Sequence, residues 1–265
     1  MQTSSPLFLP DSIAARVQGA IAEPNHVGCS DANVSFFDVD GGLFLKTDGA
    51  GRLAREAAMQ ADLHRRGFAP EVLAYETGAR DYLLSRRARG ETALLPAYLA
   101  EPAYLAEPAR LAAELGRAAR RLHETSADGC PIRCLSAEWM RAFERARTTA
   151  HGLYAPVAAY LGIDQPEDVL RFVDKHASLL RDDALIHGDF CLPNCMLADF
   201  QFTEFIDVGG AGVGNRHFDL FWALWSLNRN LGCDDFRDDF LNAYGREDVD
   251  ERLLRLSGCL CALAD

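Results

Sequence analysis

Four polar residues between positions 187 and 207 have the types and spacing that phosphoryl transfer requires. The segment "LIHGDFCLPNCMLADFQFTEFIDVGG", residues 185–210, holds His187, Asp189, Asn194 and Asp207 among mostly apolar side chains. The runs "CMLA" and "FTEFIDV" are typical of strands, and a hairpin between them would bring Asp189 and Asn194 close to Asp207. These residues supply a carboxylate for proton transfer and two oxygen ligands of the kind that Mg2+ prefers. The segment therefore predicts a site that moves a phosphoryl group with the help of a divalent cation.

Phosphoryl transfer also needs positive charge beside the nucleotide phosphates, and the first part of the chain supplies it. Lys46 ends the run "LFLK", and Glu56 follows ten residues later in "AREAAM". A strand lysine paired with a helix glutamate positions the phosphates in kinases. Phe44 lies two residues before Lys46, on the same strand face, where its ring could stack on adenine. Ser30, in the polar turn "VGCSDANV" (27–34), could cover the phosphates together with backbone N–H groups.

The hydrophobic pattern of residues 1–88 predicts a small antiparallel sheet with one helix. Two runs rich in Val and Phe, 33–39 and 42–47, flank the turn signal "DGG" and predict a hairpin. Apolar spacings of three and four predict a helix over 51–67, and strand character returns at 81–86. We expect this region to be a nucleotide-binding lobe.

Residues 89–265 change to a helical pattern. A stripe of leucine and alanine predicts a helix over 107–125, with Pro108 in its first turn. Residues 136–182 are again mostly helical, as is the last part of the chain from position 215 onward. The predicted fold class is α+β, with a small antiparallel-sheet N-lobe and a larger, mainly helical C-lobe that carries the catalytic loop and the substrate site.

The charge balance favours a cationic partner and argues against nucleic acid. There are 27 Lys and Arg against 39 Asp and Glu, so the formal net charge is −12, the wrong sign for neutralising phosphates. No run of 18 uncharged apolar residues and no leader-like N-terminus is seen, so we expect a cytoplasmic protein without a membrane partner. We also expect a monomer. The eight cysteines are expected to be reduced thiols, because the two C-x3-C spacings lack the His pair of a zinc site.

The motifs together resemble the bacterial aminoglycoside phosphotransferases of the 3′ type. "HGDFCLPN", "FIDVGGAGVGNRHFDL", "GCSDANV", "LFLKT" with "REAAM", and "RRLHET" occur in the order and at the intervals of that family, across nearly the whole chain. The resemblance implies a two-lobed, protein-kinase-like fold. It also implies transfer of the γ-phosphate of ATP to a hydroxyl of an aminoglycoside, with the 3′-hydroxyl favoured, and hence antibiotic resistance.

The resemblance assigns roles to individual residues. It implies that Asp189 is the catalytic base and that Asn194 and Asp207 are Mg2+ ligands. On the nucleotide side, it implies that Lys46 is the phosphate contact, Glu56 its partner, Ser30 a β-phosphate contact, Phe44 the adenine-stacking ring and the segment from Leu84 to Arg87 the interlobe hinge.

The substrate half of the chain is less acidic than the family pattern. Family members bind the ammonium groups of their substrates with acids before the His-Gly-Asp loop and at the C-terminus. Here the candidates are Asp164, Glu167, Asp168 and Asp265. Two alternatives therefore stay open: a kinase of another hydroxylated small molecule, and a nucleotide-binding module without activity. The second is disfavoured because the expected nucleotide and catalytic residues are all present.

Five further residues are predicted to be structural. His187 is expected to fix the catalytic loop by hydrogen bonds, and Asp219 to be a buried acid satisfied by loop backbone donors. His123 is assigned to the core, as are Trp222 and Trp225, which lie one helical turn apart.

Overall fold

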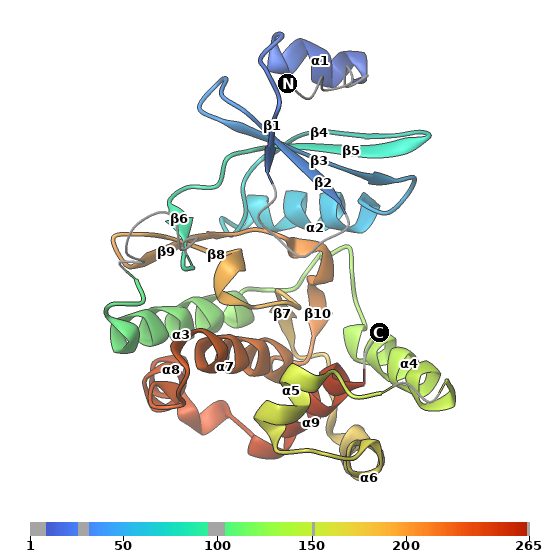
Figure 1. Ribbon diagram of the computed structural model, residues 1–265, viewed down its shortest axis with the longest axis vertical. Helices are drawn as coiled ribbons and strands as arrows, with labels where there is room; N and C mark the ends of the chain where they lie inside the picture. The colour runs from blue at the N-terminus through green and yellow to red at the C-terminus, as the bar shows by residue number, and fades with distance from the viewer. Residues whose placement is uncertain (1–8, 26–31, 95–103, 150–151, 264–265) are drawn as a thin grey trace. The chain divides into compact units, whose positions relative to one another are not determined.

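The structure is a computed structural model that describes residues 9–25, 32–94, 104–149 and 152–263 (Figure 1). The predicted site residues Ser30 and Asp265 lie outside the described residues. The chain divides into two compact units, Met1–Ala88 and Arg89–Asp265, which are described in turn. No helix within the described ranges is both long enough and apolar enough to cross a membrane.

The first unit is an antiparallel sheet with a helix on each face. Its five strands are hydrogen-bonded in the order β1-β2-β3-β5-β4. Ile13 and Val17 of α1 pack against one face, while Leu53 and Ala57, at the start of α2, pack near Leu83 on the other (Figure 1). The elements are α1 (Asp11–Val17), β1 (Glu23–Asn25), β2 (Asn33–Phe37), β3 (Leu43–Gly49), α2 (Ala54–Arg65), β4 (Val72–Thr77) and β5 (Arg80–Arg86).

The prediction of a single helix in this unit was wrong, because α1 is a second one. α1 has only seven residues and only two buried side chains, Ile13 and Val17. One apolar pair at a spacing of four is too short a pattern to distinguish a helix from a loop. The predicted hairpin and the strand at 81–86 are confirmed as β2, β3 and β5.

β3 alternates strictly between its two faces, and this alternation positions Lys46. Leu43 and Leu45 are buried in the cluster beneath α1, whereas Phe44 and Lys46 are half-buried on the opposite face. Lys46 pairs with Leu83 of β5, whose side chain packs near the start of α2. Lys46 therefore lies on the face of the sheet that α2 covers.

The carboxylate of Asp81 in β5 fixes the start of α2. Asp81 is completely buried and accepts the N–H groups of Gly51 at 2.9 Å and Leu53 at 2.8 Å. It also accepts the hydroxyls of Tyr75 at 3.0 Å and Thr77 at 2.7 Å. Burial alone would raise the pKa of Asp81, but the hydrogen bonds outweigh it and lower that pKa from its ordinary value. The N-terminal end of α2 is thereby tied to the sheet.

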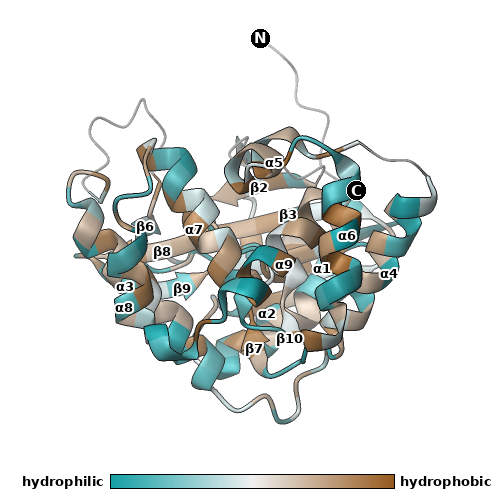
Figure 2. Cartoon of the chain, turned by 90° about the horizontal axis from the view of Figure 1, so that it is seen from below, coloured by the Kyte–Doolittle hydropathy of each residue, from teal (hydrophilic) through white to brown (hydrophobic). Residues whose placement is uncertain are grey.

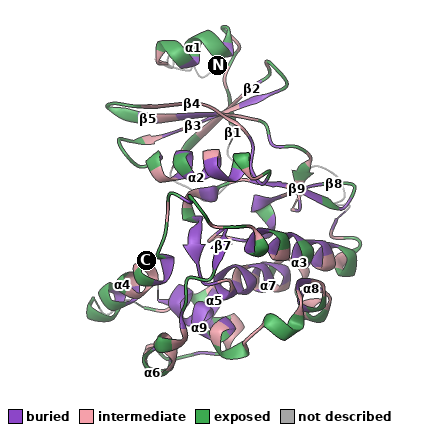
Figure 3. Ribbon diagram, turned by 180° about the vertical axis from the view of Figure 1, so that it is seen from behind, coloured by how far each residue is buried: buried purple, intermediate pink, exposed green. Residues whose placement is uncertain are grey.

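The second unit is mainly helical, which confirms the predicted α+β class. Its core runs through β7, α7 and α9, which are largely buried (Figure 3), while apolar and polar residues alternate along the outer helix α6 (Figure 2). The helices are α3 (Pro108–Glu124), α4 (Leu135–Thr148), α5 (Ala155–Leu161), α6 (Pro166–His176), α7 (His217–Leu231), α8 (Arg237–Tyr244) and α9 (Glu251–Ala262). The short 3-10 turns are η1 (Ala177–Leu179), η2 (Leu192–Asn194), η3 (Val208–Gly210) and η4 (Arg246–Asp248).

Two small sheets interrupt these helices. One pairs β7 (Ala184–Ile186) with β10 (Gly212–Gly214), and the other has the order β6-β8-β9. The strands of the second are β6 (Glu91–Thr92), β8 (Cys195–Ala198) and β9 (Gln201–Phe205). The sequence predicted β8 and β9, whereas β6, β7 and β10 have two or three residues each and were not foreseen.

The β8–β9 hairpin turns through two residues with left-handed backbone conformations. Asp199 has φ 49° and Phe200 has φ 60°, an unusual conformation for a bulky side chain. The Phe200 ring packs edge-on against Tyr104, with centroids 5.0 Å apart, and the Arg110 guanidinium lies 4.1 Å from its centroid. These contacts hold the turn that brings the two ends of the hairpin together.

Candidate functional site

His187 organises the loop that follows β7. Its Nδ1 accepts the backbone N–H of Asp189 at 3.1 Å, and its Nε2 lies 3.0 Å from the carbonyl oxygen of Ile206. Because a carbonyl can only accept, Nε2 carries the proton and Nδ1 does not. The ring is buried and so joins the loop before Asp189 to the end of β9, in the structural role expected of it.

Asp219 holds the same loop from α7. Its carboxylate accepts the backbone N–H of His187 at 2.7 Å and that of Gly188 at 2.8 Å. A third donor, Nε2 of His123 on α3, lies 3.1 Å away. Asp219 and His123 are both buried, as the sequence analysis expected.

Asn194 orients the side chain of Asp189. Its Nδ2 donates to Oδ2 of Asp189 at 2.8 Å and to the backbone oxygen of that residue at 3.0 Å. The turn η2, which carries Asn194, is held by Ser226 of α7, whose Oγ accepts the N–H of Leu192 at 3.0 Å. The sequence analysis did not single out Ser226, since a serine within a helix gives no signal of a contact 34 residues away.

Asp207 follows the second strand of the hairpin, and the backbone just before it is hydrogen-bonded to that of Asn194. The N–H of Ile206, its neighbour, donates to the carbonyl of Asn194 at 3.0 Å. Asp207 has φ 55° and ψ 51°, a left-handed conformation that aspartate tolerates better than most side chains, and it begins the turn η3. The structure therefore brings the segments that carry Asp189, Asn194 and Asp207 into one region of the second unit.

In the first unit, Lys46 and Glu56 form a close ion pair. Nζ of Lys46 lies 2.9 Å from each carboxylate oxygen of Glu56, and the two side chains are only 15% and 11% exposed. Such shielding makes the pair stronger than an ion pair in open solvent. The spacing of ten residues between strand and helix thus produces the predicted contact.

The other residues expected on the nucleotide side are placed as follows. The ring of Phe44 is half-buried and lies 5.1 Å from that of Phe36 on β2. Leu84 and Arg86, expected in a hinge, belong to β5, where Leu84 is buried and Arg86 pairs with Asp40 and Glu71. The boundary between the two units in the sequence, after Ala88, lies just beyond this strand.

Three of the four acids expected to bind substrate, Asp164, Glu167 and Asp168, lie at or just before the start of α6 and are exposed to solvent. Asp168 already pairs with Arg171 one turn further on, which offsets part of its charge. Asp164 precedes the helix and Glu167 lies in its first turn. Nearby, Tyr154 is 46% exposed, and its N–H donates to the carbonyl of Ala262 at the end of α9 at 2.9 Å.

Trp222 and Trp225 of α7 are half-buried, so they contribute to the core with one side only. Their rings meet edge to face with centroids 5.2 Å apart. Nε1 of Trp225 donates to the carbonyl of Pro156 at 3.3 Å, which ties α7 to α5.

The seven cysteines in the described ranges are free thiols. Burial is the main reason that the pKa values of Cys191, Cys195 and Cys261 are raised, so these thiols stay protonated. The negative charge of Asp189 also raises the pKa of the Cys191 thiol. Among the described residues, no group of three or more His, Cys, Asp or Glu side chains is arranged to hold a metal ion.

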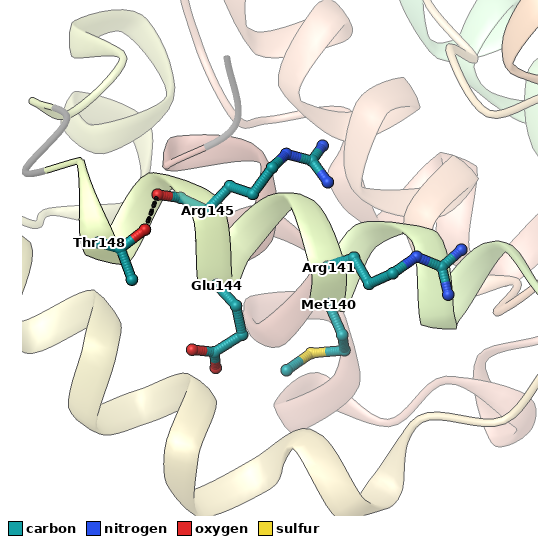
Figure 4. Close-up of a pocket in the computed structure, with 5 residues that line it drawn as sticks. All are labelled: Met140, Arg141, Glu144, Arg145 and Thr148. Carbon is teal, nitrogen blue, oxygen red and sulfur yellow. Dashed lines mark hydrogen bonds between the residues drawn. The ribbon is translucent and has the colours of Figure 1, made fainter.

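A shallow hollow of about 460 Å³ lies elsewhere on the second unit. Its lining residues all belong to α4, and they are Met140, Arg141, Glu144, Arg145 and Thr148 (Figure 4). None of the predicted site residues lines this hollow. The chemistry of the chain therefore does not centre on it.

The fold has well-defined counterparts among solved structures. Aminoglycoside-3′-phosphotransferase of type VIII superimposes with a TM-score of 0.66, at 24% identity, over 94% of this chain and 97% of that one. The aminoglycoside phosphotransferase APH(3″)-Id from Streptomyces rimosus, in complex with ADP and streptomycin, superimposes with a TM-score of 0.63, at 24% identity, over 94% and 95%. The fold is thus the protein-kinase-like fold of aminoglycoside phosphotransferases, as the sequence predicted.

Sequence comparison reaches the same family. Residues 22–256 match the phosphotransferase enzyme family, APH. A probable aminoglycoside 3′-phosphotransferase from Lactococcus lactis is 37% identical over 230 residues, which cover 86% of this chain and 85% of the relative. The chain belongs to the phosphotransferase enzyme family.

Proposed function

We propose that this protein is an ATP- and Mg2+-dependent kinase that phosphorylates a hydroxyl of an aminoglycoside, with the 3′-hydroxyl favoured. The observation that carries the proposal is the Asp189 carboxylate, which Asn194 holds at 2.8 Å at the end of a fixed loop. The Lactococcus lactis relative, a probable aminoglycoside 3′-phosphotransferase, supports the choice of acceptor. Resistance to the antibiotic would follow from its modification.

Asp189 would act as the base. A carboxylate oriented by an amide N–H can align an acceptor hydroxyl and take its proton as the phosphoryl group arrives. The backbone of the loop adds a further contact, because the N–H of Cys191 donates to the carbonyl oxygen of Asp189 at 2.8 Å. His187 and Asp219 would act only by fixing the loop, because their hydrogen bonds go to its backbone.

Asn194 and Asp207 would hold the metal ion. The Nδ2 of Asn194 is turned to Asp189, so its Oδ1 is the atom suited to a cation. An amide oxygen and a carboxylate are hard ligands of the kind that Mg2+ takes together with phosphate oxygens, so two protein side chains suffice. When bound, Mg2+ neutralises charge on the phosphate oxygens during transfer.

The first unit, residues 1–88, would bind the nucleotide. Lys46, held by Glu56, supplies a fixed positive charge for the phosphates. Phe44 on the same strand face would stack on the adenine, and Ser30 would contact the β-phosphate. Residues 89–265 would then supply the catalytic loop and the acceptor site, in a monomer that works in the cytoplasm, where ATP is available, without nucleic acid or membrane.

The net charge of −12 supports a polycationic acceptor. The acids proposed to bind it are Asp164, Glu167, Asp168 and Asp265. One observation favours a second candidate, a kinase of a less cationic hydroxylated compound: Asp168 is already paired with Arg171, and Tyr154 offers an exposed ring just before α5. An aromatic ring suits the apolar face of a sugar as well as a cation.

The test is ADP release by the purified protein with ATP, Mg2+ and a panel of aminoglycosides that have or lack a 3′-hydroxyl. Turnover confined to compounds with the 3′-hydroxyl is the expected result. ADP release that does not depend on the 3′-hydroxyl would move the transfer to another position. No release with any member of the panel would overturn the aminoglycoside proposal in favour of the second candidate.

A further inference from the structure

A buried hydrogen-bonded chain reaches Asp219 from the far side of the second unit. Nδ1 of His123 lies 3.0 Å from Oη of Tyr244, the last residue of α8, and Nε2 of the same ring lies 3.1 Å from Asp219. The two rings meet edge to face, with centroids 5.5 Å apart. Tyr244, His123 and Asp219 are 1%, 4% and 0% exposed, so water does not compete for these contacts.

With a neutral His123, the protons in this hydrogen-bonded chain point in one direction. The Asp219 carboxylate accepts two backbone N–H groups and His123 Nε2. A neutral His123 therefore carries its proton on Nε2, and its bare Nδ1 accepts. The Tyr244 hydroxyl is the donor to Nδ1, so its oxygen is left to accept from another group.

The positive charge of Arg216 also acts on Tyr244. Arg216 pairs with Asp183 at 3.0 Å, and its charge lowers the pKa of Tyr244, against the larger effect of burial. A nearby cation favours the tyrosine oxygen as an acceptor, which agrees with a hydroxyl proton directed to His123. Burial is the main reason that the pKa of Tyr244 is raised to about 12, which keeps this proton in place at neutral pH.

The close packing of α3 and α8 sets the position of the tyrosine. A Cβ atom at Gly116 would lie 2.3 Å from the carbonyl oxygen of Phe240 and 3.1 Å from the N of Tyr244. Gly116 lies two helical turns before His123, on the same side of α3. The helices can thus approach closely enough for Tyr244 to reach the imidazole.

We propose that Tyr244 is a positioning residue for the Asp189 loop, because its hydroxyl fixes the His123 tautomer that donates to Asp219. Asp219 in turn holds the amides of His187 and Gly188. The expected effect of Tyr244 on the conformation of the loop does not depend on which reaction the protein catalyses. Its expected effect on turnover rests on the proposed function. Tyr244 acts only through His123 and is not itself a catalytic residue.

The test compares Tyr244→Phe with Tyr160→Phe. Tyr160 is a matched control in the same unit: burial likewise raises its pKa to about 12, and the charge of an arginine, Arg237, likewise opposes this effect, but no histidine is involved. Three quantities are measured for wild type and both variants. These are the His123 tautomer from long-range proton–nitrogen NMR spectra, the hydrogen-exchange rates of the His187 and Gly188 amides, and kcat and KM for both substrates.

In Tyr244→Phe we expect a mixture of His123 tautomers, amide exchange at least about 10-fold faster at His187 and Gly188, and kcat about 10-fold lower with KM values nearly unchanged. Tyr160→Phe should match wild type in all three. An unchanged tautomer and unchanged exchange in Tyr244→Phe would overturn the inference. If wild type transfers phosphate to none of the acceptors, the proposed function fails, while the tautomer and the exchange rates still decide the role of Tyr244.

Discussion

A Cβ atom at Gly188 would lie 2.1 Å from the carbonyl oxygen of Gly210. The loop before Asp189 and the turn after Asp207 therefore touch through their backbones, with no space for a side chain. Gly188 also has φ +81°, a conformation that glycine adopts without strain. The contact holds together the two segments that carry the proposed base and a proposed metal ligand.

Gly188→Ala should lower the free energy of unfolding by about 3 kcal/mol, because the methyl group meets backbone that cannot move aside and φ is positive. Gly129→Ala is the matched control: Gly129 has φ +71°, but nothing lies within 4 Å of a Cβ atom built there, so this variant should lose only about 1 kcal/mol of unfolding free energy. Urea unfolding of both variants measures the difference. Equal losses of unfolding free energy in the two variants would show that the contact with Gly210 is unimportant.

Asp189→Asn should reduce kcat by about 10²–10⁴-fold, since an amide cannot take the proton of the acceptor hydroxyl. Nucleotide affinity, measured by calorimetry, should stay within a few-fold of wild type. Asp199→Asn changes an exposed aspartate in the β8–β9 turn and serves as the control with normal turnover. Wild-type kcat in Asp189→Asn would rule out the role of base.

Asp207→Asn should raise the Mg2+ concentration needed for half-maximal ADP release by at least about 10-fold, because the carboxylate charge is lost from the proposed metal site. The measurement is a Mg2+ titration at saturating ATP, again beside Asp199→Asn. An unaltered titration curve would remove Asp207 from the ligand set.

Glu56→Gln should raise KM for ATP by about 10-fold and leave KM for the acceptor unchanged, because Lys46 loses a charge-assisted hydrogen bond that fixes its position. Asp48→Asn in the same sheet is the comparison. Its ion pair with Arg52 is long, at 3.6 Å, and Arg52 is 64% exposed, so its removal should have little effect. Similar KM values for Glu56→Gln and wild type would contradict the proposed role of the pair.

Stability should fall between about pH 6.5 and pH 4 because of His217. Burial lowers the pKa of His217 to about 4 from an ordinary value of 6.5, so in this range the unfolded chain binds a proton that the folded protein does not. His217 contributes at most about 3 kcal/mol at neutral pH, which is lost as the pH falls. Urea unfolding at several pH values should show that the free energy of unfolding of His217→Gln depends less steeply on pH than that of wild type. If the two plots of unfolding free energy against pH are parallel, this histidine is not the cause.

Local patterns predicted the parts of the site that depend on local structure. Lys46 and Glu56 were paired from the sequence because a strand lysine and a glutamate of the following helix form this pair in kinases, and both elements could be recognised from their local patterns. His187 and Asp219 were expected to serve the loop because a buried polar side chain must find backbone partners.

Contacts between distant residues could not be predicted in this way. Tyr244 and His123 are 121 residues apart, and no periodicity in either helix marks the contact. The touching backbones of Gly188 and Gly210 depend on two strands of three residues each, β7 and β10, which are too short to show an alternating pattern. The helix α1 was missed because its seven residues contain only two buried side chains, too few to show a helical pattern.

The buried carboxylate of Asp81 also acts on the Lys46–Glu56 pair. It binds the N–H of Leu53, which directly precedes α2, and Glu56 follows within the first turn of that helix. With this end of α2 fastened to the sheet, Glu56 is held 2.9 Å from Lys46. The position of the proposed phosphate contact therefore depends on a carboxylate from another strand of the same sheet, which anchors the helix rather than the lysine.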